Sequence, residues 1–310
     1  QALRDYYEKW YRPDQQGIVV VGDINVDSIE NKIKRMFSPI EMPENPAERT
    51  YFPVPDNDEP LIAVAKDKEQ NIPIIYLFHK HEAVKPEEKG NMDYMVYSYL
   101  TSMIESMLNT RLEELTQKAD APFIQAFAGD GDYLLSKTKG AFMGIAAAKE
   151  DGILTATEAL MREIERVRQF GFTASEYARA KADYLRSLEV AYNERDKQRT
   201  NSYVKEYVRH FIDNEPIPGI ENEYPLMNQI VPNIPVEAVN QVVKQLIQEK
   251  NIALSVFCPE KEGMKYPTEA ELKAVIDKVK AEKLEPYVDK VSNEPLLKEK
   301  PQAGKVVKTE

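Results

Sequence analysis

Residues that commonly build catalytic and metal sites are scarce in this chain of 310 residues, which has one cysteine, Cys258, and three histidines. A single cysteine excludes an internal disulfide and any zinc cluster that needs several thiolates. It does not separate an oxidising compartment from a reducing one, because one thiol is compatible with both. Disulfide scaffolds and cysteine-based zinc modules are therefore excluded, and the compartment stays open.

Long apolar runs and excess positive charge are also absent. The longest apolar stretch, residues 18–21 with their flanks, is far shorter than the roughly 20 residues that cross a bilayer as a helix. Acidic residues outnumber basic ones by 52 to 41, and the formal net charge of -11 repels the phosphate backbone of nucleic acids. We therefore expect neither a membrane span nor a nucleic-acid partner.

What is present is an ordinary globular composition with alternating strand and helix signals. Hydrophobic residues make up 42% of the chain, enough for the core of one large domain. Short apolar runs bounded by glycine or charged turns predict strands, and apolar residues at helical spacing predict helices. The predicted order is a helix (4–11), a strand (17–22), a helix (24–37), two strands (61–66 and 72–80), a long helix (89–118), two strands within 121–149, a helix (152–171), one or two helices (173–213), a helix (235–250), a strand (251–259) and a helix (266–283).

This order predicts the α+β class, with a mixed, largely antiparallel sheet covered by helices on one face. The fully apolar strand 17–22 is predicted at the centre of the sheet, and the apolar face of the helix 24–37 is predicted to pack on it. The strands 61–66 and 72–80 are predicted to form a hairpin across a charged turn. From Leu284 onward the chain is rich in Lys, Glu and Pro, so we expect a linker that adds little stability.

One histidine pair, His79 and His81, lies at the end of a predicted strand beside Glu82. Residues two apart in a strand face the same side, so the pair could bind a metal ion. The alternative is that the strand end exposes two polar side chains to solvent. We favour the alternative, because the sequence offers no identifiable further ligand.

A second acidic motif, Ala-Gly-Asp-Gly-Asp, places Asp130 and Asp132 in a spacing that could suggest a calcium loop. The run of oxygen ligands is incomplete, so we favour a hairpin turn in which Gly129 and Gly131 supply positive backbone dihedrals. The segment Val-Val-Val-Gly-Asp has one glycine, where a phosphate-binding loop needs several. Neither motif is therefore interpreted as a ligand site.

No nucleophile or zinc-protease motif is found. Cys258 lies on an apolar strand beside Pro259 and is interpreted as a small buried hydrophobe. Neither His-Glu-x-x-His, His-x-x-Glu-His nor Gly-x-Ser-x-Gly occurs. We assign no catalytic residue and no metal-binding residue, and the substrate-binding residues stay unknown.

The opening residues carry a combined pattern. An aromatic-rich helix with Tyr7 and Trp10 ends in Tyr-Arg-Pro at Pro13, an apolar strand ends in Gly-Asp at Asp23, and a helix ends at Phe37. The aromatic rings of Tyr7, Trp10 and the neighbouring tyrosine are expected to pack against the sheet. With "LNTRLEELTQKADAPFIQAFAG" and "GFTASEYARAKADYLRSLE", this pattern resembles the second, zinc-free domain in each half of pitrilysin-type zinc metallopeptidases, the family of insulysin and mitochondrial processing peptidase.

The resemblance implies a mitochondrial processing peptidase-like metallohydrolase fold for residues 1–260, followed by a helix and an inter-half linker in residues 261–310. It implies a zinc-free domain of a zinc metalloendopeptidase that supports the catalytic domain and forms part of a peptide-enclosing chamber wall. Zinc is implied in a preceding catalytic domain, and no cofactor is implied in this chain. The implied partners are other domains of the peptidase and peptide substrates.

On this interpretation the chain alone does not hydrolyse peptides, and the longer protein is the enzyme. The alternative is a free-standing, non-catalytic binding or scaffold subunit of a two-subunit peptidase. The location is open between periplasm and cytoplasm, with the periplasm slightly favoured.

Overall fold

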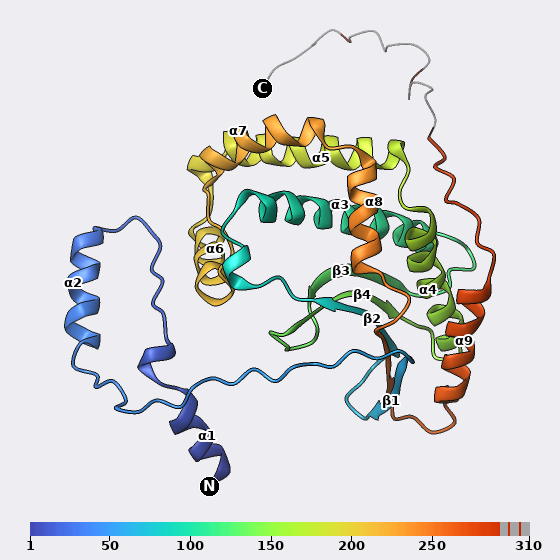
Figure 1. Ribbon diagram of the computed structural model, residues 1–310, viewed down its shortest axis with the longest axis horizontal. Helices are drawn as coiled ribbons and strands as arrows, with labels where there is room; N and C mark the ends of the chain where they lie inside the picture. Colours follow the sequence, from blue (N-terminus) through green and yellow to red (C-terminus); the bar gives the residue numbers. More distant parts are fainter. Residues whose placement is uncertain (292–296, 298–303, 305–310) are drawn as a thin grey trace.

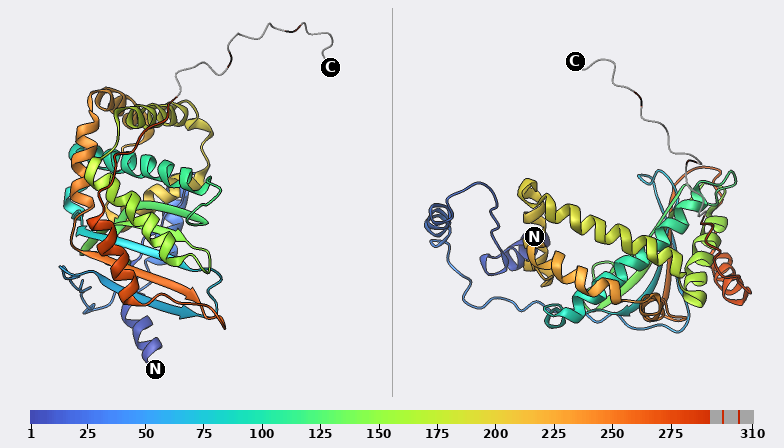
Figure 2. Two further views of the ribbon diagram at one scale, coloured as in Figure 1. Left: turned by 90° about the vertical axis from the view of Figure 1, so that its right-hand side faces the viewer. Right: turned by 90° about the horizontal axis from the view of Figure 1, so that it is seen from above.

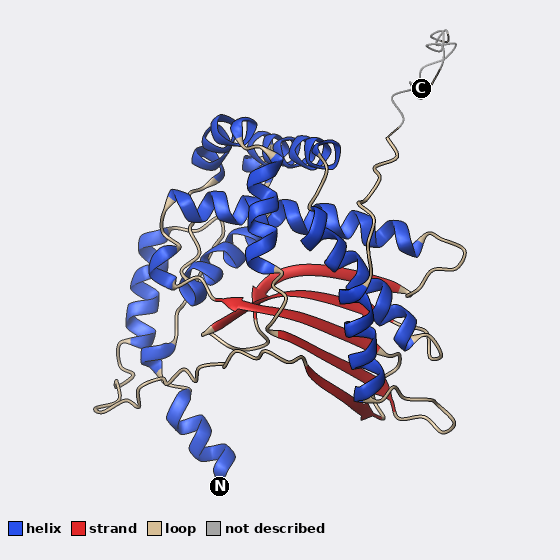
Figure 3. Cartoon of the chain, turned by 45° about the vertical axis from the view of Figure 1, so that its right-hand side comes forward, coloured by secondary structure: helices blue, strands red, loops and turns tan. Residues whose placement is uncertain are grey.

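A five-stranded sheet lies at the centre of the computed structural model, which describes residues 1–291 together with 297 and 304. The strands pair in the spatial order β1-β5-β2-β4-β3, where β1 and β5 are parallel and the three other neighbouring pairs are antiparallel. The predicted α+β class with a mixed, largely antiparallel sheet is therefore confirmed (Figure 3). The strands span Leu61–Asp67 (β1), Ile74–Glu82 (β2), Gln125–Asp132 (β3), Lys139–Ala147 (β4) and Ile252–Pro259 (β5).

Four helices cover one face of this sheet, as predicted (Figure 3). Because side chains alternate along a strand, Ile75 and Leu77 of β2 point into the helix layer and form the main core. Phe78 points to the opposite face, where it packs in a smaller cluster with Ala141 and Ala253. The covering helices are α3 (Met92–Thr116), α4 (Ile153–Phe170), α8 (Val236–Leu246) and α9 (Glu269–Ala281).

A second helical layer lies over α3, where α5 (Ala174–Asn193) and α7 (Ile220–Ile230) pack on each other (Figures 1 and 2). Between them the chain forms α6 (Thr200–Asp213), so the predicted helical region 173–213 is two helices. Single 3-10 turns occupy Pro13–Gln15, Pro86–Glu88, Arg195–Lys197 and Val231–Asn233.

The turn from α4 into α5 depends on a glycine and a capping box. Gly171 ends α4 with φ 70°, and a Cβ there would lie 2.4 Å from side-chain atoms of Asn240. Thr173 then caps α5, its hydroxyl accepting from the Glu176 backbone N–H while the Glu176 carboxylate accepts from the Thr173 backbone N–H. Thr173 and Glu176, three residues apart, therefore form a capping box at the start of α5.

The N-terminal arm, residues 1–47, extends away from the sheet (Figure 1), and its Gly17 lies against the ring of Phe211 on α6. It contains α1 (Ala2–Trp10) and α2 (Val26–Phe37), and neither helix has a buried residue. Residues 17–22 form no strand, and their backbone groups make no hydrogen bond within the described residues. The prediction that this segment is a central strand, and that α2 packs on the same sheet, is therefore wrong.

The aromatic residues of α1 do not pack on the sheet either. Tyr7 and Tyr11 are about 60% exposed, at 60% and 62%, and stack on each other with 4.8 Å between ring centroids. Trp10 is half-buried beside Lys9, whose ammonium lies 4.9 Å from the ring centroid. The expected contact between these rings and the sheet is wrong, because the arm places α1 outside the core.

The predicted hairpin of β1 with β2 is also wrong. β5 lies between these two strands, pairing in parallel with β1 and antiparallel with β2. The strand position beside β1 is therefore filled by residues about 190 positions later in the chain, as the pairing of Leu61 with Ala253 shows. A local turn signal cannot reveal such a late insertion.

The chain remains on the body after the last strand. α9 packs on α4 and contributes four buried side chains to the main core. Leu284 is 5% exposed, and Arg162 Nε lies 3.0 Å from both carboxylate oxygens of Glu282. The first residues of the expected linker therefore pack on the body, and its small contribution to stability stays a prediction. Most of 292–310 lies outside the described residues. The division near residue 260 stays a prediction. The residues that α9 buries are Leu272, Val275, Ile276 and Val279.

Candidate functional site

His79 and His81 both project from β2 into the helix layer, and both are buried, at 3% and 9% exposed. Their common side agrees with strand alternation, but the favoured prediction of two solvent-exposed histidines is wrong. His79 Nδ1 lies 3.0 Å from the Gln248 carbonyl oxygen and donates to it. Burial lowers the pKa of His79 to about 4, so the ring is neutral near pH 7.

His81 is held by a carboxylate two strands away. Its Nε2 lies 2.7 Å from Asp130 Oδ1 on β3, and its Nδ1 lies 2.9 Å from the Glu82 carbonyl oxygen. The ring crosses β4 above Gly140, where an added Cβ would lie 2.5 Å from the His81 Cε1 atom. Burial lowers the pKa of His81, but the hydrogen bond and charge of Asp130 outweigh burial and raise it.

The ring nitrogens of the two histidines differ in what they contact. Both ring nitrogens of His81 face acceptors, so neither presents a lone pair to a substrate or a metal. His79 Nε2 is buried without a hydrogen-bond partner. Within the described residues no group of three or more His, Cys, Asp or Glu could hold a metal ion.

Asp130 belongs to the wall of a polar pocket of about 360 Å³ at this end of the sheet. Glu105 of α3 faces it and accepts a hydrogen bond of 2.8 Å from the Asp130 backbone N–H. Burial raises the pKa of Glu105. Tyr94 donates from its hydroxyl to both carboxylate oxygens of Glu215, at 2.7 and 2.8 Å. The pocket therefore presents carboxylates and tyrosines from β3, α3 and the segment after α6.

The hairpin turn predicted around Asp130 is in the wrong place. Gly129 and Gly131 lie inside β3, paired with Met143 and Ala141 of β4, and neither has a positive φ. The turn comes later, where Leu134 has φ 54°. Strand β3 therefore runs through the motif and directs the side chain of Asp130 to His81.

Cys258 is fully buried on β5, as predicted, and burial raises the pKa of its thiol. A buried, protonated thiol is a poor nucleophile. The interpretation of this residue as a small hydrophobe is confirmed.

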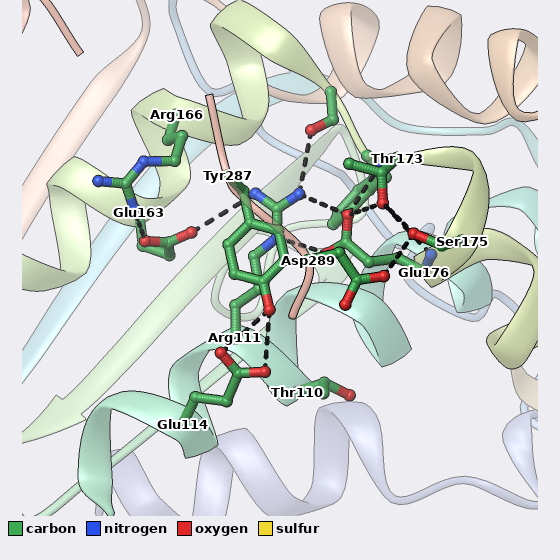
Figure 4. Close-up of polar contacts among 12 residues, drawn as sticks. Thr110, Arg111, Glu114, Glu163, Arg166, Thr173, Ser175, Glu176, Tyr287 and Asp289 are labelled. Atoms are coloured by element: carbon green, nitrogen blue, oxygen red, sulfur yellow. Dashed lines mark hydrogen bonds and ion pairs between the residues drawn. The ribbon is translucent and has the colours of Figure 1, made fainter. Parts of the chain in front are cut away.

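A buried ion-pair network around Arg111 was not identified from the sequence (Figure 4). Arg111 of α3 donates from Nε and Nη2 to the two carboxylate oxygens of Glu176, at 2.6 and 2.9 Å. Nη2 also donates to the Gly171 carbonyl oxygen at 3.2 Å, and Nη1 reaches Glu163 Oε1 at 3.5 Å. The residue therefore fastens the α4–α5 turn to α3.

The ring of Tyr287 lies over the same guanidinium, 4.1 Å from its Cζ atom to the ring centroid (Figure 4). Its hydroxyl donates to the Glu114 carboxylate, at 2.9 Å to the nearer oxygen. Asp289, two residues after Tyr287, accepts hydrogen bonds from Arg179 of α5. The segment after α9 is thus held on α3 and α5.

A sequence signal for Arg111 existed. Ile104, Leu108 and Arg111 follow one another at spacings of four and three, so the arginine occupies a core position of a helix whose other inward residues are apolar. A charged residue at such a position requires a buried partner. The identity of the partner was not predictable, because Glu163 and Glu176 lie more than fifty positions later in the chain.

Comparison with known proteins gives one family match and several related proteases. The family described as "Peptidase M16 inactive domain" matches residues 1–184. The chain is 24% identical over 310 residues to the zinc protease PQQL-like of Arabidopsis thaliana, covering 98% of this chain and 29% of that protein. It is 24% identical over 245 residues to the probable zinc protease PqqL of Escherichia coli (strain K12), covering 79% of this chain and 26% of that protein.

Solved structures share the fold. The periplasmic protease PqqL from Escherichia coli matches with a TM-score of 0.75 at 22% identity, over 96% of this chain and 32% of that one. The first half of the same protease matches with a TM-score of 0.74 at 22% identity, over 93% of this chain and 60% of that one. The chain thus spans less than a third of the length of these two curated relatives.

Proposed function

Because the chain belongs to the peptidase M16 inactive domain family, we propose that it is a zinc-free domain of a longer zinc protease and docks on a neighbouring domain through its N-terminal arm. In this role it supports the catalytic domain and forms part of the wall of a chamber that encloses peptides. The zinc and the catalytic residues belong to another domain of the longer protein. Similarity to a periplasmic protease supports a periplasmic location.

The exposed strand-like segment of the arm carries this proposal. Ile18 and Val20 are about half exposed, at 49% and 47%, and their backbone groups are unpaired within the described residues. They line a shallow apolar surface together with Ile24, Ile29 and Ile33 of the turn and α2. An apolar extended segment with free backbone groups is a template for strand addition.

The C-terminal part of the same chain contains a strand, turn and helix in the same order as the strand-like segment, turn and helix of the arm, and there both the strand and the helix are packed. β5 is an apolar strand followed by a turn and the capped helix α9. The arm repeats this order with the apolar residues 17–22, a turn and α2. Asn25 caps α2, because its Oδ1 accepts a hydrogen bond of 2.9 Å from the Ser28 backbone N–H. β5 has a strand on each side, and α9 buries its apolar face. Within the described residues, 17–22 have no neighbouring strand and α2 has no buried residue, so a sheet of the neighbouring domain is the best partner for the arm.

Hydrogen exchange on two polypeptides tests the proposal. In the 310-residue chain alone, we expect the amides of 18–21 to exchange at nearly unprotected rates, because they have no partner. In a polypeptide that also carries the residues encoded before Gln1, the same amides should become protected by at least a hundredfold. Unchanged exchange in the longer polypeptide would refute docking through this segment.

A substitution provides the matched control. Val20→Asp should leave the urea midpoint of the 310-residue chain unchanged, because Val20 makes no core contact, but should remove the protection gained in the longer polypeptide. Asp27→Asn, on the exposed first turn of α2, should change neither measurement. Loss of stability of the isolated chain by Val20→Asp would mean that Val20 packs on the body of its own chain.

A further inference from the structure

A cavity of about 540 Å³ lies between α3, α5, α6 and α7, outside the pocket that holds His81. Its walls include the side chains of Tyr99 on α3, Tyr184 on α5 and Tyr203 on α6. The cavity shares Tyr94, Ser98 and Glu215 with the polar pocket, so the two hollows adjoin. Its volume suits a long side chain rather than a folded partner.

Two carboxylates in this cavity lack a cation. Glu206 of α6 and Glu223 of α7 both line it, and neither forms an ion pair within the described residues. The other acidic lining residues are already paired, Glu215 with Lys89 at 2.8 Å and Glu221 with Arg195 at 3.7 Å. Arg209 also lines the cavity, but it is exposed and pairs with neither Glu206 nor Glu223.

The electrostatics of the cavity favour a positive occupant. Burial raises the pKa of Glu223, and the negative charge of Glu206 raises it further. Burial, together with the charge of Glu223, raises the pKa of Tyr184 to about 12. A cation placed here would relieve the repulsion between the two carboxylates and would face the electron-rich surface of tyrosine rings.

We propose that this cavity binds the guanidinium side chain of an arginine in an extended peptide, between the carboxylates of Glu206 and Glu223 and the ring of Tyr184. A guanidinium fits better than a metal ion, because no group of three metal-ligating side chains exists in the described chain. Its planar fork can donate to two carboxylates while its face stacks on an aromatic ring. The inference relies on the proposed function only for the source of the arginine, a peptide in the chamber.

Ligand-observed NMR on the 310-residue chain tests the site with acetyl-arginine amide as the probe. Acetyl-citrulline amide is the control, because it has nearly the same shape without the charge. We expect saturable binding of the arginine probe and at least tenfold weaker binding of the citrulline probe. Equal binding of both probes, or no saturable binding of the arginine probe, would overturn the proposal.

Variants locate the binding. Glu223→Gln should weaken binding of the arginine probe about tenfold, and Tyr184→Leu should weaken it severalfold. Glu237→Gln, on an exposed position of α8, should leave binding unchanged. If Glu223→Gln fails to fold by circular dichroism, Glu206→Gln replaces it with the same expected loss. Unchanged affinity in the folded carboxylate variant would refute the site, while the exchange experiment on the arm would be unaffected.

Discussion

Replacement of Arg111 by methionine should destabilise the domain by about 3 kcal/mol. Methionine keeps much of the apolar volume but removes the charge that faces Glu176 and Glu163, both of which are nearly fully buried. Breaking a buried ion pair on one side costs about 3–5 kcal/mol. We expect the lower end, because Glu176 retains the Thr173 hydroxyl and backbone N–H, and Glu163 retains Arg166.

Urea unfolding at pH 7, followed by circular dichroism, measures this loss from the shift of the midpoint at constant slope. Arg179→Met is the matched control, because Arg179 pairs with Asp289 at 2.8 Å but has a side chain 49% exposed. Exposed pairs contribute about 0–1 kcal/mol, so the control should move the midpoint little. A loss below about 1 kcal/mol for Arg111→Met would refute the assignment of the network as the fastening of the α4–α5 turn.

Three further predictions follow from the described contacts. Gly140→Ala should push His81 away from Asp130, because the new Cβ would lie 2.5 Å from His81 Cε1. An NMR titration should then show a lower pKa for His81 than in the parent chain. An unchanged pKa would contradict the contact between His81 and Asp130. The folded pKa of His79, about 4, lies below the ordinary value of 6.5, so its contribution to stability is complete above pH 6.5 and is lost as the pH falls toward 4. Between pH 6.5 and pH 4.5, the free energy of unfolding measured in urea should fall by about 2 kcal/mol less in His79→Asn than in the parent chain. Equal falls in the two proteins would mean that burial does not keep His79 neutral. Leu284→Ala should lower the free energy of unfolding by about 2 kcal/mol in the same assay, because Leu284 is 5% exposed. An unchanged free energy would mean that Leu284 adds no stability, as expected of a linker residue.

Local patterns in the sequence determined most helices and their ends, and the presence of strands β3 and β4 but not the turn between them. The periodic apolar residues of α3 and α4 marked both helices, Gly171 marked the end of α4, and the capping-box residue Thr173 marked the start of α5. These signals are reliable because each depends on residues within a few positions of one another. The fold class followed from the order of elements, and the family resemblance followed from combined local motifs.

The tertiary structure alone decided which distant segments meet. The insertion of β5 between β1 and β2, the pairing of His81 with Asp130 across Gly140, and the partners of Arg111 all join parts that are far apart in the chain. The apolar run 17–22 has the period and composition of a central strand, yet has no sheet partner within the described residues. Periodicity fixes the kind of element a segment forms, but its partner depends on long-range packing that no local pattern encodes.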